Sequence, residues 1–422
     1  MKPRVVVVGA GFGGLTAVQA LDQADVEITL IDRTNHHLFQ PLLYQVATGG
    51  LSPADIAAPV RHILRKQKNV TVIEDTVRSI GRDSVTTDTA RIRFDVLIVA
   101  TGATHHYFGN DEWAPHAPGL KTLPDAVRLR TDILEAFEEA ERSGSGDLTF
   151  LVIGGGPTGV EMAGAISEMA RDTLRQDFRR FDPARSRVLL VEAEDRVLGT
   201  YPASLSRRGE DQLVELGVEV LTGWRITHLD ATSAVLQSDE ETIELEPQVT
   251  VWAAGVKASP LGEELGGLGA SLDRAGRVEV EPDLSIPGHP SIYVIGDLAA
   301  VKQGDGLVPG VAPAAMQMGE YVADRIGGRT TMPFRYRDKG SLATIGRSAG
   351  VADLGRLRFW GFPAWAAWLG IHIFFLIGFQ NRIAVMAQWA WSYFTRDRSA
   401  RLIVRYHAAR DRDHRRKNDS AR

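Results

Sequence analysis

Two stretches of this chain repeat one pattern, in which an apolar run leads into a glycine-rich turn. The first is Val5–Val8 with glycines between residues 9 and 14, and the second is Leu148–Ile153 with glycines between 154 and 159. Each turn is followed by a helix-like pattern and a second apolar run. A strand, glycine turn, helix and strand in this order form the unit that binds dinucleotides. The duplication predicts an α/β fold with two Rossmann-like domains.

The first turn has the spacing of a phosphate-binding loop. Gly9 and Gly11 allow a tight turn and close backbone approach, and Gly14 lets the helix pack on the strand. A pyrophosphate would lie on the helix N-terminus, where free N–H groups and the helix dipole favour anions. The next apolar run, 26–31, ends at Asp32, 18 residues after Gly14, where a carboxylate can bind a ribose 2′-hydroxyl. A glycine turn without a ligand is the alternative, which this context disfavours.

The second turn, with Gly154, Gly156 and Gly159, has the same context. Its acid, Glu192, comes 33 residues after Gly159, which is longer than the usual interval of about 20. The extra length predicts a longer helix, from about residue 158 to about 178. A carboxylate at Glu192 would repel a 2′-phosphate, so we expect NADH rather than NADPH here; a solvated acid at a strand end is the alternative.

Two dinucleotide sites in one chain suggest an electron relay. A flavin can accept a hydride from a nicotinamide and pass electrons onward, whereas two nicotinamide sites would have no such use. We therefore expect FAD at one site and NADH at the other.

The domain order follows from further apolar runs that end in small residues, at 96–102, 249–255 and 292–297. The first two would return the chain from one domain to the other, and 114–121 contains two prolines and a glycine. We expect an FAD domain of residues 1–113 and 266–335, an inserted NADH domain of residues 114–265, and a third module of residues 336–422.

The third module has its own composition. Residues 359–381 contain no Asp, Glu, Lys or Arg, and five of the eight tryptophans lie between Trp360 and Trp391. Trp365, Trp368, His372, Phe375 and Phe379 follow helical steps of three or four residues. Residues 396–422 carry a net charge of +6, against −11 for the remainder. Aromatic amphipathic helices beside a basic tail predict a monotopic anchor in the membrane interface. A transmembrane helix and a buried dimer interface are the alternatives.

The absence of cysteine narrows the chemistry. It excludes thiolate nucleophiles, redox-active dithiols and iron–sulfur clusters. The paired histidines at 36–37 and 105–106 lack metal-ligand spacing, so we expect no metal. The N-terminus enters a short apolar run without a signal-like segment, so we expect the protein to remain in the cytoplasm.

Several motifs together resemble one family, the type II NADH dehydrogenases, which are non-proton-pumping NADH:quinone oxidoreductases. The resemblance spans nearly the whole chain. The motifs are HHLFQPLLYQVA at 36–47, GGGPTGVE at 154–161, WAAGV at 252–256, YVIGDLA at 293–299, ATIGR at 343–347, LGIH at 369–372 and GFQNR at 378–382.

The resemblance implies a set of site residues. Glu161 is the acid near the nicotinamide–flavin contact, and Phe39–Ala47 runs along the flavin ring. The implied FAD residues are Gly9, Gly11, Phe12, Gly13, Gly14, Asp32, Arg33, Gln45, Val77, Thr101, Gly102, Asp297 and Ala314. The implied NADH residues are Gly154, Gly156, Thr158, Gly159, Glu161, Glu192, Ala254 and Gly255, and the implied quinone residues are Gln317 and Met316.

One position departs from the family pattern. The quinone site often has two glutamines separated by three residues, but here Pro313 stands in place of the first and Gln317 matches the second. Proline suits the first turn of a helix. We expect the amide of Ala314, free at this helix start, to face the flavin where charge builds on reduction.

The function that follows is FAD-dependent oxidation of NADH with two-electron reduction of a membrane quinone and no proton pumping. The resemblance also implies a homodimer on the cytoplasmic face of the membrane, without a nucleic-acid partner. Sulfide:quinone and disulfide reductases need the missing cysteines. A flavoprotein reductase of a soluble carrier and an NADH-sensing flavoprotein that acts through a partner remain alternatives, and menaquinone and ubiquinone remain equally open.

Overall fold

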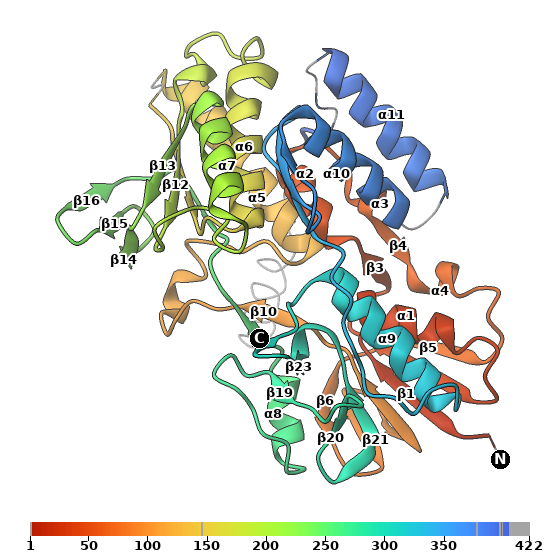
Figure 1. The fold of residues 1–422 in the computed structure, drawn as a ribbon. Coiled ribbons are helices and arrows are strands. Elements are labelled where there is room, and N and C mark those ends of the chain that lie inside the picture. The colour runs from red at the N-terminus through yellow and green to blue at the C-terminus, as the bar shows by residue number, and fades with distance from the viewer. Residues whose placement is uncertain (1, 145–146, 377–378, 396–397, 399, 405–422) are drawn as a thin grey trace, which may run out of the picture.

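The structure is a computed structural model that describes residues 2–144, 147–376, 379–395, 398 and 400–404. It contains two α/β lobes and a C-terminal region that packs beside them (Figure 1).

The first lobe is built on a six-stranded sheet with β1 near its middle. The apolar side chains of β1 (Arg4–Val8) are almost fully buried, as expected for a strand covered on both faces. On one face, helix α1 (Phe12–Ala20) packs against α9 (Ala312–Ile326), and the approach is close because a Cβ on Gly319 would lie 2.4 Å from the Gly13 carbonyl oxygen. The strand order is β20 (Ser285–Ile286), β21 (His289–Val294), β9 (Val96–Val99), β1, β2 (Glu27–Asp32) and β5 (Val70–Glu74), parallel except at β20.

Shorter elements complete this lobe. The segment after β2 forms a small ribbon and short helices that lead toward the second lobe, and a separate three-stranded sheet covers one end. These elements are β3 (His36–Leu38), α2 (Leu43–Ala47), α3 (Pro53–Ile56), β4 (Ala57–Pro59), α4 (Val60–Ile63), β6 (Val77–Ile80), β7 (Ser84–Thr87), β8 (Arg91–Arg93), β19 (Val278–Glu279), β22 (Ala299–Ala300), β23 (Lys302–Gln303) and β24 (Gly306–Leu307).

The second lobe repeats the same plan on a parallel four-stranded sheet. Its order is β13 (Val218–Thr222), β12 (Arg187–Glu192), β11 (Thr149–Ile153) and β17 (Val249–Trp252). The surrounding elements are α5 (Leu123–Ser143), α6 (Pro157–Glu168), α7 (Ala203–Glu215) and a sheet of β14 (Arg225–Leu229), β15 (Ala234–Gln237) and β16 (Thr242–Leu245). The duplicated dinucleotide-binding fold predicted from the sequence is therefore present.

Helix α6 is shorter than the predicted span of about 158–178. The α-helical part ends at Glu168 and is followed by a π-helical stretch over Met169–Thr173. The amide of Leu174, just after this stretch, donates to the Met169 carbonyl at 2.9 Å. Phe178 instead stacks on Phe137 of α5, with ring centroids 6.0 Å apart. Packing of this ring against α5 accounts for the early end of the helix.

The chain crosses between the lobes through an antiparallel ribbon of β10 (Ala103–His105) and β18 (Val256–Ala258). Both crossings precede the predicted boundaries after residues 113 and 265. Trp113 packs with Trp252 of the second lobe, while α8 (Leu261–Gly266) contacts β6 and β19 of the first lobe. These contacts place Trp113 with the second lobe and α8 with the first, and the exact domain boundaries stay a prediction.

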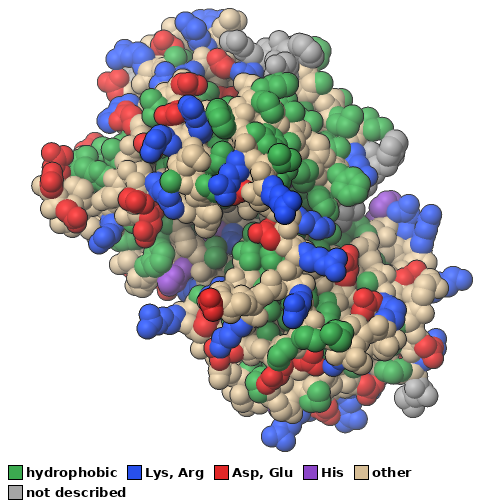
Figure 2. Space-filling view, in the orientation of Figure 1, with side chains coloured by type: hydrophobic (Ala, Val, Ile, Leu, Met, Phe, Trp, Pro, Cys, Tyr) green, Lys and Arg blue, Asp and Glu red, His purple; other side chains and the backbone are tan. Residues whose placement is uncertain are grey.

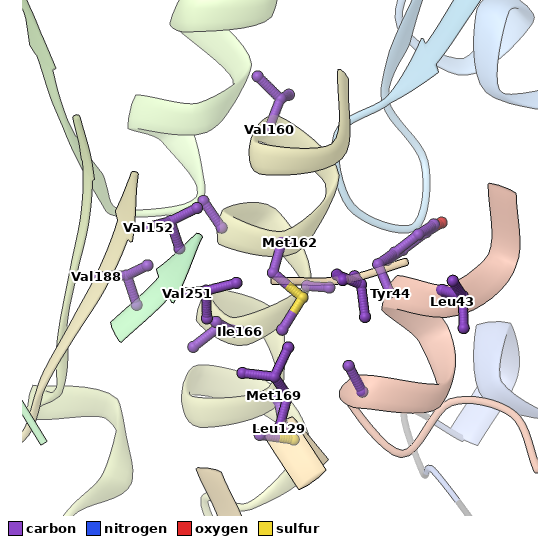
Figure 3. Close-up of a cluster of buried hydrophobic side chains, with 14 of the residues drawn as sticks. Leu43, Tyr44, Leu129, Val152, Val160, Met162, Ile166, Met169, Val188 and Val251 are labelled. Atoms are coloured by element: carbon purple, nitrogen blue, oxygen red, sulfur yellow. The ribbon is translucent and has the colours of Figure 1, made fainter. Parts of the chain in front are cut away.

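The C-terminal region consists of the sheet β25 (Ser341–Thr344), β26 (Gly350–Asp353) and β27 (Arg358–Trp360), followed by α10 (Phe362–Phe375) and α11 (Phe379–Thr395). Its buried side chains join the core of the second lobe. Figure 3 shows part of this core, where Met162 and Ile166 of α6, and Met169 at the start of the π-helical stretch, lie between the sheet and Tyr44 of α2.

Part of the aromatic stripe, Trp368 and His372 of α10, packs against the rest of the protein, and the membrane anchor stays a prediction. Trp368 is 2% exposed, whereas Phe362 and Phe374 on the other side of the helix are open to solvent. Apolar side chains gather on the surface of α10 and α11 (Figure 2). No helix within the described residues is both long and apolar enough to cross a bilayer.

Candidate active site between the two glycine loops

The two glycine loops have nearly identical geometry. A Cβ on Gly14 would lie 1.9 Å from the Gly9 carbonyl oxygen, and one on Gly159 would lie 1.8 Å from the Gly154 carbonyl oxygen. Each helix therefore approaches its strand as closely as a glycine allows. At the middle glycine, Gly11 or Gly156, a Cβ would meet nothing within 4 Å. This open space beside a helix N-terminus is where a pyrophosphate fits.

The strand-end acids bond back to the glycine loops. The Ala10 amide donates to Asp32 Oδ2 at 2.6 Å, and the Gly155 amide donates to Glu192 Oε2 at 2.6 Å. The other oxygen of Asp32 accepts from Thr34, and that of Glu192 from the Glu194 amide. Although Glu192 follows its loop by a longer interval, β11 and β12 pair in the same way as β1 and β2, so the two acids occupy equivalent positions.

The remaining first-lobe residues fit a flavin dinucleotide. Thr101, which follows β9, has a buried hydroxyl with no hydrogen-bond partner among the described residues, and a Cβ on Gly102 would be unobstructed. Asp297 lies in the short 3-10 helix Gly296–Leu298 that follows β21. Burial lowers the pKa of Lys121, and the charge of Asp297 partly opposes this effect. An unsatisfied hydroxyl and an open cradle beside the first glycine loop match the donors and space that FAD requires.

Other predicted residues take varied positions around the loops. Phe12 at the start of α1 packs edge-on against His37 and Phe39, with centroids 5.2 and 5.8 Å away. Arg33 is exposed and Val77 begins β6. Thr158 is exposed at the start of α6, and Ala254 and Gly255 follow β17, the strand beside the second loop.

Glu161 lies one turn into α6, immediately after the second glycine loop. It is partly buried, and burial raises its pKa to about 8. The Thr344 backbone and the Trp368 side chain partly oppose this rise in pKa. A carboxyl group with such a pKa is largely protonated at neutral pH and can exchange a proton near pH 8.

Aromatic side chains surround Glu161. His372 stacks on Trp368 at 4.0 Å between centroids and meets Phe39 edge-on at 6.0 Å. Burial lowers the pKa of His372 to about 4, so its ring is neutral at pH 7. Tyr44 packs edge-on to Trp368, and burial raises its pKa well above the usual value.

Gln45 links the first lobe to α11. Its side-chain N–H donates to the Tyr44 hydroxyl at 2.9 Å, and its carbonyl oxygen accepts from the Trp389 indole at 2.6 Å. Both ends of the amide are therefore held, and Gln45 keeps a fixed orientation.

The helix start at α9 differs from the prediction at Ala314. Pro313 lies in the first turn, as expected, but the Ala314 amide donates to the Val311 carbonyl at 3.0 Å and is not free. A short-range bond in the first helical turn satisfies this donor. Gln317 is also committed, because its amide both donates to and accepts from the Arg337 backbone, at 3.0 and 2.9 Å; Met316 beside it is partly buried.

Sequence reasoning did not name Trp368, His372 and Trp389 as site residues, and it included Tyr44 only as part of Phe39–Ala47. All four lie within motifs or compositional segments that the sequence singled out, but only the packing shows which of them meet. The helical spacing of Trp368 and His372 predicted a shared face but not the stacking of the two rings.

Comparison with known proteins agrees with this geometry. Residues 3–319 match the family described as pyridine nucleotide-disulphide oxidoreductase. The type II NADH:quinone oxidoreductase Ndh of Mycobacterium tuberculosis is 46% identical over 96% of this chain and 90% of its own length. The chain belongs to the type II NADH:quinone oxidoreductases. The Staphylococcus aureus type II NADH:quinone oxidoreductase is 31% identical over 83% of this chain and 89% of its own length.

Solved structures support the fold of this type II NADH:quinone oxidoreductase. NDH2 of Plasmodium falciparum in complex with NADH aligns with a TM-score of 0.86 at 20% identity, covering 96% of this chain and all of that one. The sulfide:quinone oxidoreductase of Aquifex aeolicus aligns with a TM-score of 0.72 at 18% identity, with 96% of both chains covered. The latter resemblance concerns the fold alone.

Proposed function

We propose that this chain oxidises NADH and reduces a quinone by two electrons, with FAD bound at the first glycine loop. One observation carries the proposal: Glu161, on the helix that leaves the second glycine loop, interacts electrostatically with Tyr44 of the first lobe and with Trp368 of the C-terminal region. Tyr44 and Trp368 pack edge-on to each other, so a nucleotide on the second loop and a cofactor on the first loop would approach the same group of side chains.

The chain's own residues bind and orient the reactants. The loop of Gly154–Gly159 binds the NADH pyrophosphate, and Glu192 binds the ribose hydroxyls and disfavours a 2′-phosphate. The loop of Gly9–Gly14, together with Asp32, Thr101 and Asp297, holds FAD. When bound, FAD supplies the two-electron chemistry that connects a hydride donor to a quinone.

Glu161 serves as the proton-handling residue. Reduction of a quinone to a quinol takes up two protons, and a carboxyl group with a pKa of about 8 holds a proton at neutral pH. The aromatic walls of Phe39, Tyr44 and Trp368 exclude water and suit a planar apolar ring. Gln317 and Met316 on α9 stay candidates for quinone contact, although the Gln317 amide would first have to release the Arg337 backbone.

The exposed apolar surface of α10 and α11 supports peripheral attachment to a membrane, where quinones reside. Ile371, Phe374, Ile383, Met386 and Trp391 are exposed on these helices. We place this surface on the cytoplasmic face of the membrane and expect the protein to act as a homodimer. The basic residues 405–422 lie outside the described residues.

Steady-state turnover tests the activity. NADH oxidation should be slow without an acceptor and strongly stimulated by short-chain menaquinone or ubiquinone analogues. Reduced ferredoxin-type carriers should not form at a comparable rate. A lack of quinone stimulation in flavin-loaded protein would contradict the proposal, and release from membranes by salt alone would contradict hydrophobic attachment.

A further inference from the structure

Phe108 combines two features that are unusual for a large aromatic residue. Its side chain is 61% exposed, and its φ of 53° lies in the left-handed region, which bulky residues rarely adopt. A ring this exposed gains little from burial, so packing in the core does not account for the strained backbone. Residues held in such conformations cluster at active sites and in segments that clamp ligands.

The turn that carries Phe108 is attached to the end of β17 in the second lobe. The amide of His106, two residues earlier, donates to the Gly255 carbonyl at 3.4 Å, and the His106 carbonyl accepts from the Trp252 indole at 3.1 Å. The centroid of the Phe108 ring lies 4.6 Å from that of His106 and 6.3 Å from that of Trp252. These contacts hold the exposed ring beside the residues that follow β17.

The Phe108 ring lies directly against the backbone of Gly255. A Cβ on Gly255 would lie 2.6 Å from the ring carbon Cζ and 3.0 Å from Cε2, so the ring occupies the space that a side chain would take. Gly255 also has a φ of 73°, which favours glycine. The WAAGV motif at 252–256 thus contacts a ring that comes from the turn after β10.

The strand order of the second lobe sets the direction of a dinucleotide bound there. Strand β11, which leads into the second glycine loop, lies between β12 and β17. Ligands of such sheets bind at the carboxyl ends of the strands, where the chain connections separate to either side. Glu192 at the end of β12 is on the adenosine side, so a nucleotide with its pyrophosphate on the loop extends its nicotinamide half toward the end of β17. Gly255 and the Phe108 ring lie at that end.

We propose that Phe108 contacts the nicotinamide half of bound NADH and helps to hold its ring at the end of β17. This inference rests on the proposed function, in which the second glycine loop binds NADH. A phenyl ring packs well on a planar heteroaromatic ring. Because the turn already holds the Phe108 ring in place, less conformational entropy is lost when the nucleotide binds.

Binding measurements with two nucleotides test the proposal. NAD⁺ carries the nicotinamide ring and ADP-ribose lacks it, so only NAD⁺ binding should depend on Phe108. We would measure both dissociation constants by calorimetry in full-length, flavin-loaded protein. Phe108→Ala should weaken NAD⁺ binding about fivefold, equivalent to about 1 kcal/mol and within the range for an aromatic pair, and leave ADP-ribose binding unchanged. An equal loss for both nucleotides, or no loss for NAD⁺, would overturn the inference.

Steady-state kinetics supply a second measurement. In Phe108→Ala the KM for NADH should rise by a similar factor, whereas the KM for a short-chain quinone and the flavin content should stay at their wild-type values. Phe108→Tyr keeps the ring and should retain the wild-type KM for NADH. A KM that rises only for the quinone would overturn the inference.

Phe108→Gly separates the effect of the ring from that of the strained backbone, because glycine adopts a positive φ readily. This variant should weaken NAD⁺ binding as much as Phe108→Ala does, while its thermal unfolding midpoint should be the higher of the two. Wild-type affinity for NAD⁺ in Phe108→Gly would show that the backbone of the turn, and not the ring, matters, and would overturn the inference.

Leu357→Ala is the matched control, because Leu357 is 65% exposed and lies in the turn between β26 and β27. It should leave the affinities for both nucleotides unchanged. Equal NAD⁺ affinity in the wild type and in Phe108→Ala would overturn the inference alone. A flavin-loaded wild-type protein that binds neither nucleotide would overturn the proposed function, and the inference with it.

Discussion

The two glycine loops have the same local structure but lie in different surroundings. Each residue of the first loop has a counterpart 145 positions later, from Gly9 and Gly154 to Gly14 and Gly159. In both loops the third glycine lies against the carbonyl oxygen of the first. In both, a backbone amide of the loop donates a hydrogen bond to the carboxylate at the end of the next strand. The phosphate-binding part of a site is therefore local and repeatable.

The difference lies just beyond the loops. At the position where α6 carries Glu161, α1 carries Thr16. Helix α1 packs against α9 through glycines, whereas α6 is covered by the C-terminal region and continues into a π-helical stretch. We therefore propose that the duplicated scaffold binds the nucleotides, while the side chains packed around α6 take part in the chemistry.

Replacing the third glycine of either loop should have the largest effect. Gly14→Ala and Gly159→Ala each place a methyl group within 2 Å of a backbone carbonyl oxygen, so the loop must move. We expect Gly14→Ala to purify without flavin and Gly159→Ala to keep its flavin but lose at least about a hundredfold in kcat/KM for NADH, since a displacement of about 1 Å has such an effect. Visible absorbance and steady-state kinetics separate the two.

Gly370→Ala is the matched control, because a Cβ there on the exposed face of α10 would meet nothing within 4 Å. It should retain both flavin and activity. If Gly14→Ala instead kept its flavin and lost NADH oxidation, the assignment of the two loops to FAD and NADH would have to be exchanged.

Charged contacts at the C-terminal end of α6 should contribute to stability, and α1 has no comparable contacts at its end within the described residues. Glu168 accepts from the buried Arg398 side chain at 3.2 Å and from the Arg347 amide at 2.7 Å. Arg398→Met leaves Glu168 buried with Arg347 Nε, 3.6 Å from Oε1, as its remaining cation. We expect the free energy of unfolding to fall by about 1.5–3 kcal/mol, as for a lost hydrogen bond to a charged group. Thermal unfolding should show a clearly lower midpoint than that of Arg356→Met, an exposed site between β26 and β27. Equal midpoints would show that Arg398 adds nothing to the fold.

Glu161→Gln tests the chemical difference between the helices. The variant keeps the shape of the side chain but cannot exchange a proton. We expect kcat to fall by about a hundredfold, because proton transfer by a positioned side chain contributes about 10²–10⁴-fold. Thr16→Val at the equivalent position of α1 should change kcat little. A kcat near the wild-type value in Glu161→Gln would mean that both helices serve only to bind.

The same variant has a predicted effect on the pH dependence of stability. The pKa of Glu161 is raised from an ordinary value of 4.5 to about 8, so the folded state binds this proton more tightly than the unfolded state. Its contribution is fully present below about pH 4.5 and is lost as the pH rises through about 8. Glu161→Gln should lack this loss, which urea unfolding at a series of pH values would measure.

Local patterns explain why much of the site could be predicted. The two loops, Asp32 and Glu192 depend on contacts within one strand–helix–strand unit, and the sequence of that unit is enough to specify them. The predictions of a free amide at Ala314 and of a helix that reaches residue 178 were wrong. Each depends on which hydrogen bonds and packing contacts the nearby groups form in the folded chain. The tryptophans of α10 show the same limit, since an aromatic stripe suits a protein core as well as a membrane interface, and only the packing of Trp368 against Tyr44 decides between them.

The smallest expected effect concerns the strand-end acids, which are the most similar part of the two loops. Glu192→Gln keeps an oxygen that can accept from the Gly155 amide but removes the charge that would repel a 2′-phosphate. We expect the preference for NADH over NADPH to fall by about tenfold, equivalent to about 1.4 kcal/mol, with little change in flavin content. Asp32→Asn should leave the preference between the two nucleotides unchanged, because Asp32 belongs to the other loop. A change of preference in Asp32→Asn but not in Glu192→Gln would show that the nicotinamide nucleotide binds at the first loop.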